Sequence, residues 1–399
     1  MQGESPKVKV VLEESLAIYR QAGPEYHQDL AYVLSYLGSC EVDAGNLDRG
    51  LALTYEAFNL YKECNDRFGM ADNLGTIGFH DLEPARKKKA HLEGLANVEA
   101  IGDEDGIATA LINLGTDAFN EGEYEEASTF FKESYEHFRK VGNPTAMAFL
   151  IQLQAECCFY IGDFEQAAQR YDEAKEMRQE TGINRGVIYC LMRKCDLALA
   201  QGDYAQALKN NEEVLAFFQK TSDPRGFAIA VSQKAKLARL QGDTSQAVQL
   251  AQDRLRIGRE NGFAAVMLMA LEELGKLALL DNDLLKAGAL FQESCNYIKI
   301  TRPMSRTVLI YNQPDPLLFA SLASLAVRKQ EMERAARLFG MAEHRCRGLA
   351  NILAPVDRAQ YTADLAAARD ALGEAHFEQL FQEGKAMTLD QTIDYAMDV

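Results

Sequence analysis

The chain has 399 residues, of which 47% are hydrophobic, and this proportion excludes a generally disordered protein. A formal net charge of −17 argues against binding to nucleic acid, because a surface that binds phosphate needs clustered Lys and Arg. No apolar run approaches the roughly 18 residues of a membrane span, and the N-terminus lacks the apolar stretch of a signal peptide. The sequence therefore predicts a cytoplasmic protein that contacts neither nucleic acid nor membrane.

The sequence offers no recognisable site for a metal, a cofactor or a reaction. Its eight cysteines form no Cys-x-x-Cys pair, and no histidine stands at metal-ligand spacing from them. A phosphate-binding loop of the form GxxxxGK[ST] is absent. Acidic pairs such as Glu13-Glu14 diverge on a helix and do not converge on one reacting bond. We therefore predict a protein without metal, cofactor or catalytic residues.

The first predicted element is a helix over residues 8–22. It resembles the second helix of a repeat whose first helix is missing, so that residues 1–29 form a truncated repeat. A stack of repeats that begins halfway leaves an apolar face uncovered. We therefore expect the chain to be part of a longer protein, or to associate with a second copy through this end.

A 40-residue repeat dominates the chain from residue 30 to residue 300. Its clearest mark is a glycine that an acidic residue and then an aromatic residue follow in most repeats, as in Gly162-Asp163-Phe164. A second glycine series lies halfway between, and glycine can adopt the left-handed conformation that ends a helix. The two glycine series therefore predict that each repeat consists of a helix, a turn, a second helix and a second turn. The two series are Gly122, Gly162, Gly202, Gly242 and Asn282, and Gly102, Gly142, Gly182, Ser222 and Gly262.

Small and aromatic residues follow the same period. A small residue such as Gly115 or Ala155 stands seven residues before the turn glycine, and an alanine such as Ala127 stands five residues after it. In four repeats a large aromatic such as Phe131 stands nine residues after it. Small residues let two helices approach closely, while the aromatic ring fills the space beside them. A fixed period of this size predicts an all-α solenoid of about eight helix pairs.

Beyond residue 300 the pattern changes. Residues 301–316 hold Pro303, Pro314 and Pro316 and predict a protruding loop. Residues 317–399 predict a last repeat followed by a C-terminal helical cap. Near the end, Thr388 and Gln391 predict a capping box, in which each side chain bonds the backbone N–H of the other residue.

The repeat resembles the tetratricopeptide repeat, whose consensus places a small residue at position 8, Ala at position 20 and an aromatic at position 24. Gly115, Ala127 and Phe131 occupy these places in one unit. The resemblance covers about residues 30–345 and implies a right-handed superhelix whose first helices line a concave face. The period of 40 departs from the usual 34, which implies longer helices.

The C-terminal segment resembles the tail of the bacterial signal-transduction ATPases with numerous domains (STAND) and of related LuxR-type regulators. Their tetratricopeptide arrays end in a segment of the form AARLxGAAE, then P, R, Y, ALG, F, G and LTLDEA. This sequence carries Ala335-Ala336-Arg337-Leu338-Phe339-Gly340, then Pro355, Arg358, Tyr361 and Ala371-Leu372-Gly373. The resemblance implies a sensor arm that contacts other modules of a multidomain regulator.

Tetratricopeptide superhelices usually contact a bound peptide through positions 5, 6, 9, 12 and 13 of each repeat. Amide side chains suit such a groove because they bond both the donor and the acceptor of a peptide backbone. Aromatic side chains can form the floor of an apolar pocket. Packing against adjacent repeats is the alternative interpretation of the same residues. The candidates by register are Asn73, Thr76, Phe79, His80, Asn113, Thr116, Phe119, Asn120, Gln152, Glu156, Phe159, Tyr160, Arg193, Asp196, Gln233 and Lys236.

These observations predict a non-catalytic sensor domain of a multidomain bacterial signalling or transcription regulator. Its partner would be a protein or a peptide, or else a small effector. The alternative is a stand-alone scaffold that forms a homodimer through its first 40 residues. An enzyme with an unrecognised site is the least favoured of the three hypotheses.

Overall fold

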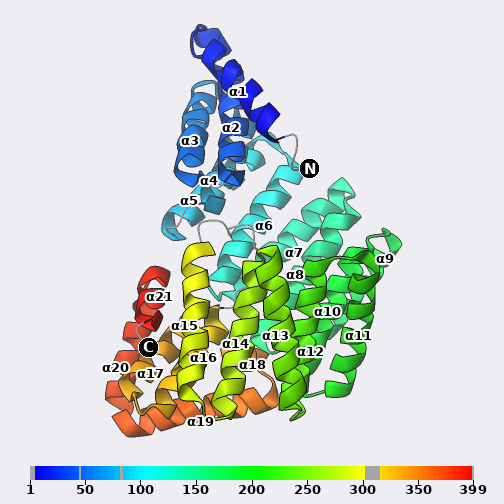
Figure 1. The fold of residues 1–399 in the computed structure, drawn as a ribbon. Helices are drawn as coiled ribbons and strands as arrows, with labels where there is room; N and C mark the ends of the chain where they lie inside the picture. The colour runs from blue at the N-terminus through cyan, green and yellow to red at the C-terminus, as the bar shows by residue number, and fades with distance from the viewer. Residues whose placement is uncertain (1–4, 45, 81–83, 302–314, 398–399) are drawn as a thin grey trace. The chain divides into compact units, whose positions relative to one another are not determined.

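The protein is helical throughout the part that the structure describes, which comprises residues 5–44, 46–80, 84–301 and 315–397 of a computed structural model (Figure 1). Within these ranges there is no strand, and the helices pack in consecutive pairs. The all-α solenoid prediction is confirmed. The predicted loop 301–316 lies, apart from its ends, outside the described residues, as do Asp81, Leu82 and Glu83.

The helices follow one another through short turns. In chain order they are α1 (Ser5–Tyr19), η1 (Pro24–Tyr26), α2 (His27–Asp43), α3 (Leu47–Glu63), α4 (Arg67–His80), α5 (Pro84–Ile101), α6 (Glu104–Asn120), α7 (Tyr124–Val141), α8 (Pro144–Ile161), α9 (Phe164–Glu180), α10 (Asn184–Gln201), α11 (Tyr204–Thr221), α12 (Pro224–Leu240), α13 (Thr244–Asn261), α14 (Ala264–Leu280), α15 (Leu284–Thr301), α16 (Asp315–Arg328), α17 (Met332–Arg345), α18 (Leu349–Ile352), α19 (Pro355–Leu372), α20 (Glu374–Ala386) and α21 (Leu389–Met397).

The chain divides into two compact units. The N-terminal unit contains the described residues of 1–118 together with 126–147. The C-terminal unit contains residues 119–125 and 148–301, and the described residues from 315 onward. No helix in the described part of the chain is long and apolar enough to cross a membrane.

The turn residues end and begin helices as the repeat predicts. All the glycines of both series adopt positive φ, and so do Ser222 (φ 52°) and Asn282 (φ 58°). The aspartate that follows the glycine then caps the next helix, since Asp163 Oδ1 accepts a hydrogen bond from the backbone N–H of Gln166 at 3.1 Å. Such a cap satisfies a backbone donor that the helix itself leaves unpaired. One Gly-Asp pair therefore ends the first helix of a repeat and starts the second.

The small and aromatic positions of the repeat form its interior. Ala127 and Phe131 of α7 are fully buried. A Cβ added at Gly115 of α6 would lie 2.5 Å from the ring of Phe131, so the ring occupies the space that the glycine leaves free. The same close fit joins Gly275 of α14 to Phe291 of α15. Helix pairing in these repeats therefore follows from a small residue facing an aromatic one.

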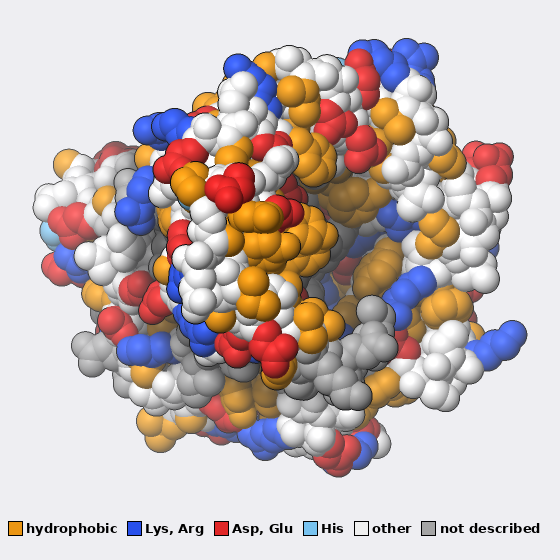
Figure 2. Space-filling model, turned by 90° about the horizontal axis from the view of Figure 1, so that it is seen from above, with side chains coloured by type: hydrophobic (Ala, Val, Ile, Leu, Met, Phe, Trp, Pro, Cys, Tyr) orange, Lys and Arg blue, Asp and Glu red, His pale blue; other side chains and the backbone are white. Residues whose placement is uncertain are grey.

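The first helix exposes part of its apolar surface. Val8, Val11 and Ile18 of α1 are 48%, 60% and 68% exposed, although Leu16 is buried in the core that α1 shares with α2 and α3. Figure 2 looks down on the N-terminal end of Figure 1, and hydrophobic side chains gather at the centre of this face beside acidic ones. An exposed apolar patch of this kind is typical of an interaction surface.

The C-terminal segment adds helices α19, α20 and α21 to the last pair, α16 and α17. The predicted capping box is confirmed, because the N–H of Thr388 donates to Gln391 Oε1 at 2.9 Å and the N–H of Gln391 donates to Thr388 Oγ1 at 3.3 Å. Helices α17 and α20 approach each other at two glycines. A Cβ at Gly340 would lie 2.0 Å from the carbonyl oxygen of Phe381, and one at Gly384 would lie 2.1 Å from that of Arg337.

We expect Gly340→Ala to destabilise the C-terminal helices by about 1–3 kcal/mol, because backbone atoms meet the added methyl group and one helix must move. Gly94→Ala in α5 is a suitable control, since its added Cβ would find no atom closer than 3.6 Å. Urea denaturation followed by circular dichroism measures both changes. A Gly340→Ala protein as stable as the Gly94→Ala protein would show that α17 and α20 do not pack this closely.

Candidate functional site

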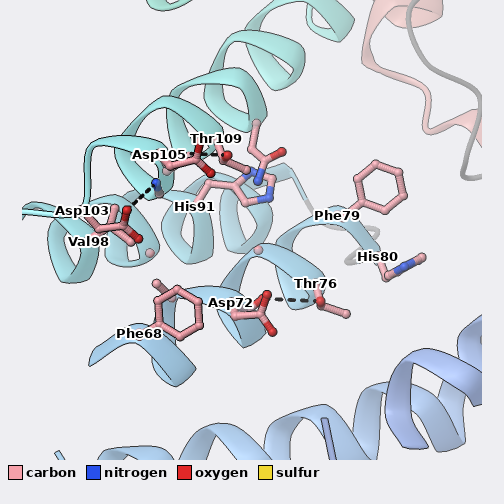
Figure 3. Close-up of a pocket in the computed structure, with 16 residues that line it drawn as sticks. Phe68, Asp72, Thr76, Phe79, His80, His91, Val98, Asp103, Asp105 and Thr109 are labelled. Carbon is pink, nitrogen blue, oxygen red and sulfur yellow. Dashed lines mark hydrogen bonds between the residues drawn. The ribbon is translucent and has the colours of Figure 1, made fainter. Parts of the chain in front are cut away.

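A pocket of about 450 Å³ opens between α4, α5 and α6 of the N-terminal unit (Figure 3). Small residues leave the room for it, because a Cβ added at Gly75 of α4 or at Gly94 of α5 would touch nothing within 3.5 Å. Its described lining consists of Phe68, Ala71, Asp72, Gly75, Thr76, Phe79 and His80 of α4, His91, Gly94 and Val98 of α5, Asp103 before α6, and Asp105, Gly106, Thr109, Ala110 and Asn113 of α6.

Four of the residues predicted by register line this pocket: Thr76, Phe79, His80 and Asn113. The Phe79 ring is 37% exposed and packs edge-on against His80 at 5.0 Å between ring centroids. Asn73, which the register also predicts, is buried and does not line the pocket. Its amide donates to the carbonyl oxygen of Gly69 at 2.8 Å and to Ser35 Oγ at 3.0 Å, so it joins α4 to α2.

The pocket wall also contains a buried histidine that the register did not select. His91 is 3% exposed, and its Nδ1 lies 2.5 Å from Asp117 Oδ2 of α6. The second oxygen of Asp117 pairs with Lys87 Nζ at 2.6 Å. Because the carboxylate accepts, Nδ1 carries a proton, and in a neutral ring Nε2 then has a free lone pair. No hydrogen-bond partner for Nε2 exists among the described residues.

The repeat that contains Gly75 differs from the others at two consensus positions. Counting from Gly75, Lys87 stands at position 20 and His91 at position 24, where other repeats carry alanine and an aromatic. In this repeat, two polar side chains that both bond Asp117 thus replace the alanine and the aromatic residue that pack together in other repeats. The sequence carries this substitution openly, but the repeat lacks the turn glycine that marks the start of the second helix in the other repeats.

Asp72 lies at the mouth of the pocket, exposed to solvent. Although the side chain reaches solvent, the protein atoms that surround it displace part of its water and raise the pKa of its carboxyl above the usual value. Neither an ion pair nor a hydrogen bond to this carboxylate occurs in the described ranges. Its negative charge is therefore not neutralised by the protein.

The predicted residues of the C-terminal unit bond mainly to one another. Glu156 of α8 is fully buried and receives three hydrogen bonds of 2.6–3.0 Å from the guanidinium of Arg193 in α10. Arg193 also donates to Asp196 at 2.8 Å, and Gln233 of α12 donates to the other oxygen of Asp196 at 2.9 Å. This polar network joins three successive first helices and leaves few of their bonding groups for a ligand.

The aromatic candidates of this unit form a cluster with Tyr124 of α7. Phe119 packs edge-on against Tyr124 and against Tyr160, at 5.1 Å between centroids in each case. Phe159 is buried, and the guanidinium of Arg193 lies 5.4 Å from its ring centroid. Of the remaining candidates, Gln152 of α8 is buried, whereas Thr116 and Asn120 of α6 and Lys236 of α12 are half-buried.

A segment near the C-terminus returns to the turns of earlier repeats, which the sequence did not predict. Within the C-terminal unit, Arg347 pairs with Glu123 at 2.6 Å, and Asn351 Nδ2 donates to the carbonyl oxygens of Tyr160 and Ile161 at 3.2 and 3.0 Å. Arg347 also lies against the turn glycine Gly122 and Asn351 against Gly162, so these contacts advance four residues along the segment and 40 along the array. Residues 346–358, which make these contacts, are called the return segment below.

The return segment continues across the next two repeats. Pro355 lies against Gly202, and Arg358 donates to the carbonyl oxygen of Ala200 at 3.3 Å. Asp357 then forms a bidentate pair with Arg239 of α12, at 2.7 and 2.9 Å. A solenoid in which each repeat contacts only its neighbours is therefore an incomplete description of this protein.

Burial by itself would raise the pKa of Asp357. The hydrogen bonds and charge of Arg239, together with the charges of Lys276 and Lys236, outweigh burial and hold the pKa of Asp357 below its usual value. Arg239 pairs as well with Glu273 of α14 at 2.6 Å. The charge of the predicted candidate Lys236 therefore acts on Asp357 of the return segment.

A comparison with protein families bears on these repeats. Residues 106–180 match the tetratricopeptide repeat family. These residues are tetratricopeptide repeats. They span α6 to α9, and the same turns, caps and buried small residues recur through the flanking helix pairs. Among proteins of curated function, none matches the sequence significantly.

Several solved structures resemble the fold at low sequence identity. Aspartyl phosphate phosphatase F from Bacillus subtilis is 14% identical, with 71% of this chain and 73% of that chain covered and a TM-score of 0.54. The apo form of the quorum sensor NprR from B. thuringiensis is 15% identical, with 90% and 98% covered and a TM-score of 0.50. A STAND protein with a tetratricopeptide repeat sensor from Pyrococcus horikoshii is 14% identical, with 94% and 67% covered and a TM-score of 0.47. These likenesses concern the fold alone.

No group of three or more metal-ligating side chains occurs in the part of the chain that the structure describes. The side chains that meet in the pocket are carboxylates, imidazoles, an amide and aromatic rings on rigid helices. Such a lining can hold a ligand by hydrogen bonds, charge and apolar contact.

Proposed function

We propose that this protein is a non-catalytic sensor module that recognises a protein or peptide segment through the pocket between α4, α5 and α6. The pocket is the observation that carries the proposal. It lies on helices of a repeat array, which is a fold suited to extended binding surfaces, and it gathers four residues selected by register. The tetratricopeptide match at 106–180 and the fold of the solved regulators support the same proposal.

The wider role in this proposal is that of a sensor arm in a multidomain bacterial signalling or transcription regulator of the STAND or LuxR type. Its support is the resemblance of the C-terminal segment from Ala335 onward. In that role, a ligand must bind one state of the regulator more tightly than the other, because equal affinity would shift no population.

Selection of peptides from a displayed random library by the full chain tests the pocket. Peptides recovered on the wild-type protein should lose about tenfold or more in affinity for a Phe79→Ala, Asn113→Ala double variant, because central aromatic and hydrogen-bonding contacts dominate such interfaces. Glu99→Ala, at an exposed residue of α5 outside the pocket lining, is the control. Recovery of no peptide, or equal binding to the double variant, would reject the proposed function.

Self-association is a second candidate, and the exposed Val8, Val11 and Ile18 of α1 favour it. The molar mass of the chain in solution, measured by light scattering, distinguishes a homodimer from a monomer.

A further inference from the structure

The charge of the pocket lining has one sign. Asp72, Asp103 and Asp105 contribute three carboxylates, and no Lys or Arg is found among the described residues of the lining. One oxygen of Asp103 accepts the backbone N–H of Gly106 at 3.1 Å, and no ion pair to its carboxylate occurs in the described ranges. Neither Asp72 nor Asp105 has an ion-pair partner in the described ranges. An anionic ligand would meet three like charges here, whereas a cation would meet three opposite ones.

A second observation independently indicates a hydrogen-bond donor as the ligand. His91 is buried in the pocket wall, its proton is held on Nδ1 by Asp117, and its Nε2 has no partner among the described residues. A buried acceptor without a donor is costly, so such a group in a native protein calls for an explanation. Nε2 packs against Gly78 of α4, where an added Cβ would lie 2.4 Å from it, so a ligand N–H would supply the missing donor once α4 and α5 part at this contact.

Aromatic rings stand at both ends of the pocket. Figure 3 shows Phe68 at one end and Phe79 at the other, with Asp72 and Thr76 between them along α4. Phe68 is 63% exposed, so its ring is accessible to a ligand in the pocket. Aromatic faces attract cations and pack against the aliphatic part of Arg or Lys side chains.

We propose that the pocket takes the cationic side chain of an arginine or lysine in the partner peptide, with Asp72 and Asp105 as its counter-charges, His91 Nε2 as a hydrogen-bond acceptor and Phe68 and Phe79 against its aliphatic stem. This inference rests on the proposed function and specifies its ligand. The raised pKa of Asp72 agrees with a carboxylate that lacks a counter-charge in the free protein. A bound cation would lower that pKa again.

The experiment compares peptides that differ in one group. Two otherwise identical peptides from the library selection, one with arginine and one with citrulline, are titrated into the full chain by calorimetry. N-acetyl-arginine methylamide and its citrulline analogue are titrated in the same way, and these two probes do not depend on the outcome of the selection. Citrulline keeps the shape of arginine and removes its charge. The arginine form should bind about tenfold or more tightly, because close charge pairs dominate such differences, and added salt should reduce the ratio.

Protein variants locate the effect. Asp72→Asn should bring the arginine probe close to the affinity of the citrulline probe, whereas Glu99→Gln, on the exposed face of α5, should leave the ratio unchanged. Equal affinities for arginine and citrulline, no binding of either probe at millimolar concentration, or an unchanged ratio in Asp72→Asn would overturn the inference. Selected peptides that need Phe79 and Asn113 but no cation would overturn it while leaving the proposed function intact.

Discussion

Replacement of Arg193 by alanine is expected to destabilise the C-terminal unit by about 3–5 kcal/mol, because it leaves the carboxylate of Glu156 buried without a counter-charge. Glu156 has 0% exposure, and the guanidinium of Arg193 donates three hydrogen bonds to its two oxygens. The variant also loses the packing of the guanidinium over the ring of Phe159. A fall in the urea concentration at the unfolding midpoint, followed by circular dichroism, measures the effect.

Two further variants separate this loss from the removal of any arginine. Arg185→Ala lies on the same helix, α10, where Arg185 is 61% exposed and pairs with Asp223, so it should change the stability by less than about 1 kcal/mol. The double variant Arg193→Leu, Glu156→Leu removes both charges and should recover much of the loss. An Arg193→Ala protein no less stable than Arg185→Ala would show that the buried pair does not hold α8 to α10.

This outcome bears on the function of the predicted groove residues. Register alone does not distinguish the two units, because Glu156 occupies the same repeat position as Thr76. In the same way, Arg193 occupies the same repeat position as Asn113. In the C-terminal unit these positions carry opposite charges on adjacent helices, and they pair. In the N-terminal unit the corresponding side chains are small, neutral or aromatic, and a pocket remains between the helices.

The sequence predicts most of the fold because the period is a local signal. The turn glycines, the aspartate caps, and the alanine and aromatic positions each report a conformation or a contact within one repeat, and the structure confirms them. Exceptions to the pattern were harder to interpret. Asn211 stands where other repeats carry an aromatic, and in the structure it is fully buried with its amide donating to the carbonyl oxygen of Ala230 at 2.8 Å.

The return segment could not be predicted, for a different reason. Asn351 and Arg358 bond to backbone carbonyl groups about 190 and 158 positions away, and a carbonyl group has no sequence signature. The pocket is an intermediate case. Thr76, Phe79, His80 and Asn113 came from register, but the role of His91 depends on Asp117, a residue at a position that the repeat consensus does not specify.

Replacement of Arg239 by leucine is the second change with a large expected effect, about 3 kcal/mol of lost stability, because the largely buried carboxylates of Glu273 and Asp357 then lose the guanidinium that both of them bond. The side chains of Arg239, Glu273 and Asp357 are only 5%, 11% and 15% exposed. Arg256→Leu is the control, since Arg256 on α13 is 60% exposed. Urea midpoints at pH 7 measure both variants, and equal midpoints for the two would contradict a role for Arg239 in anchoring the return segment.

The pH dependence of this loss identifies Asp357 as the partner. Arg239 depresses the pKa of folded Asp357, so the stabilisation is fully present above the unfolded value of about 3.9 and is lost as the pH falls through the lower folded value. In Arg239→Leu, the guanidinium no longer opposes the effect of burial, so the pKa of Asp357 rises. Asp357 then becomes protonated as the pH falls, and its repulsion from Glu273 is removed. The stability difference between the wild-type and Arg239→Leu proteins should therefore shrink between pH 7 and pH 3. In an Asp357→Asn background the part of this shrinkage that comes from Asp357 should disappear, because the amide does not titrate; a difference that shrinks equally in both backgrounds would place the effect on Glu273 alone.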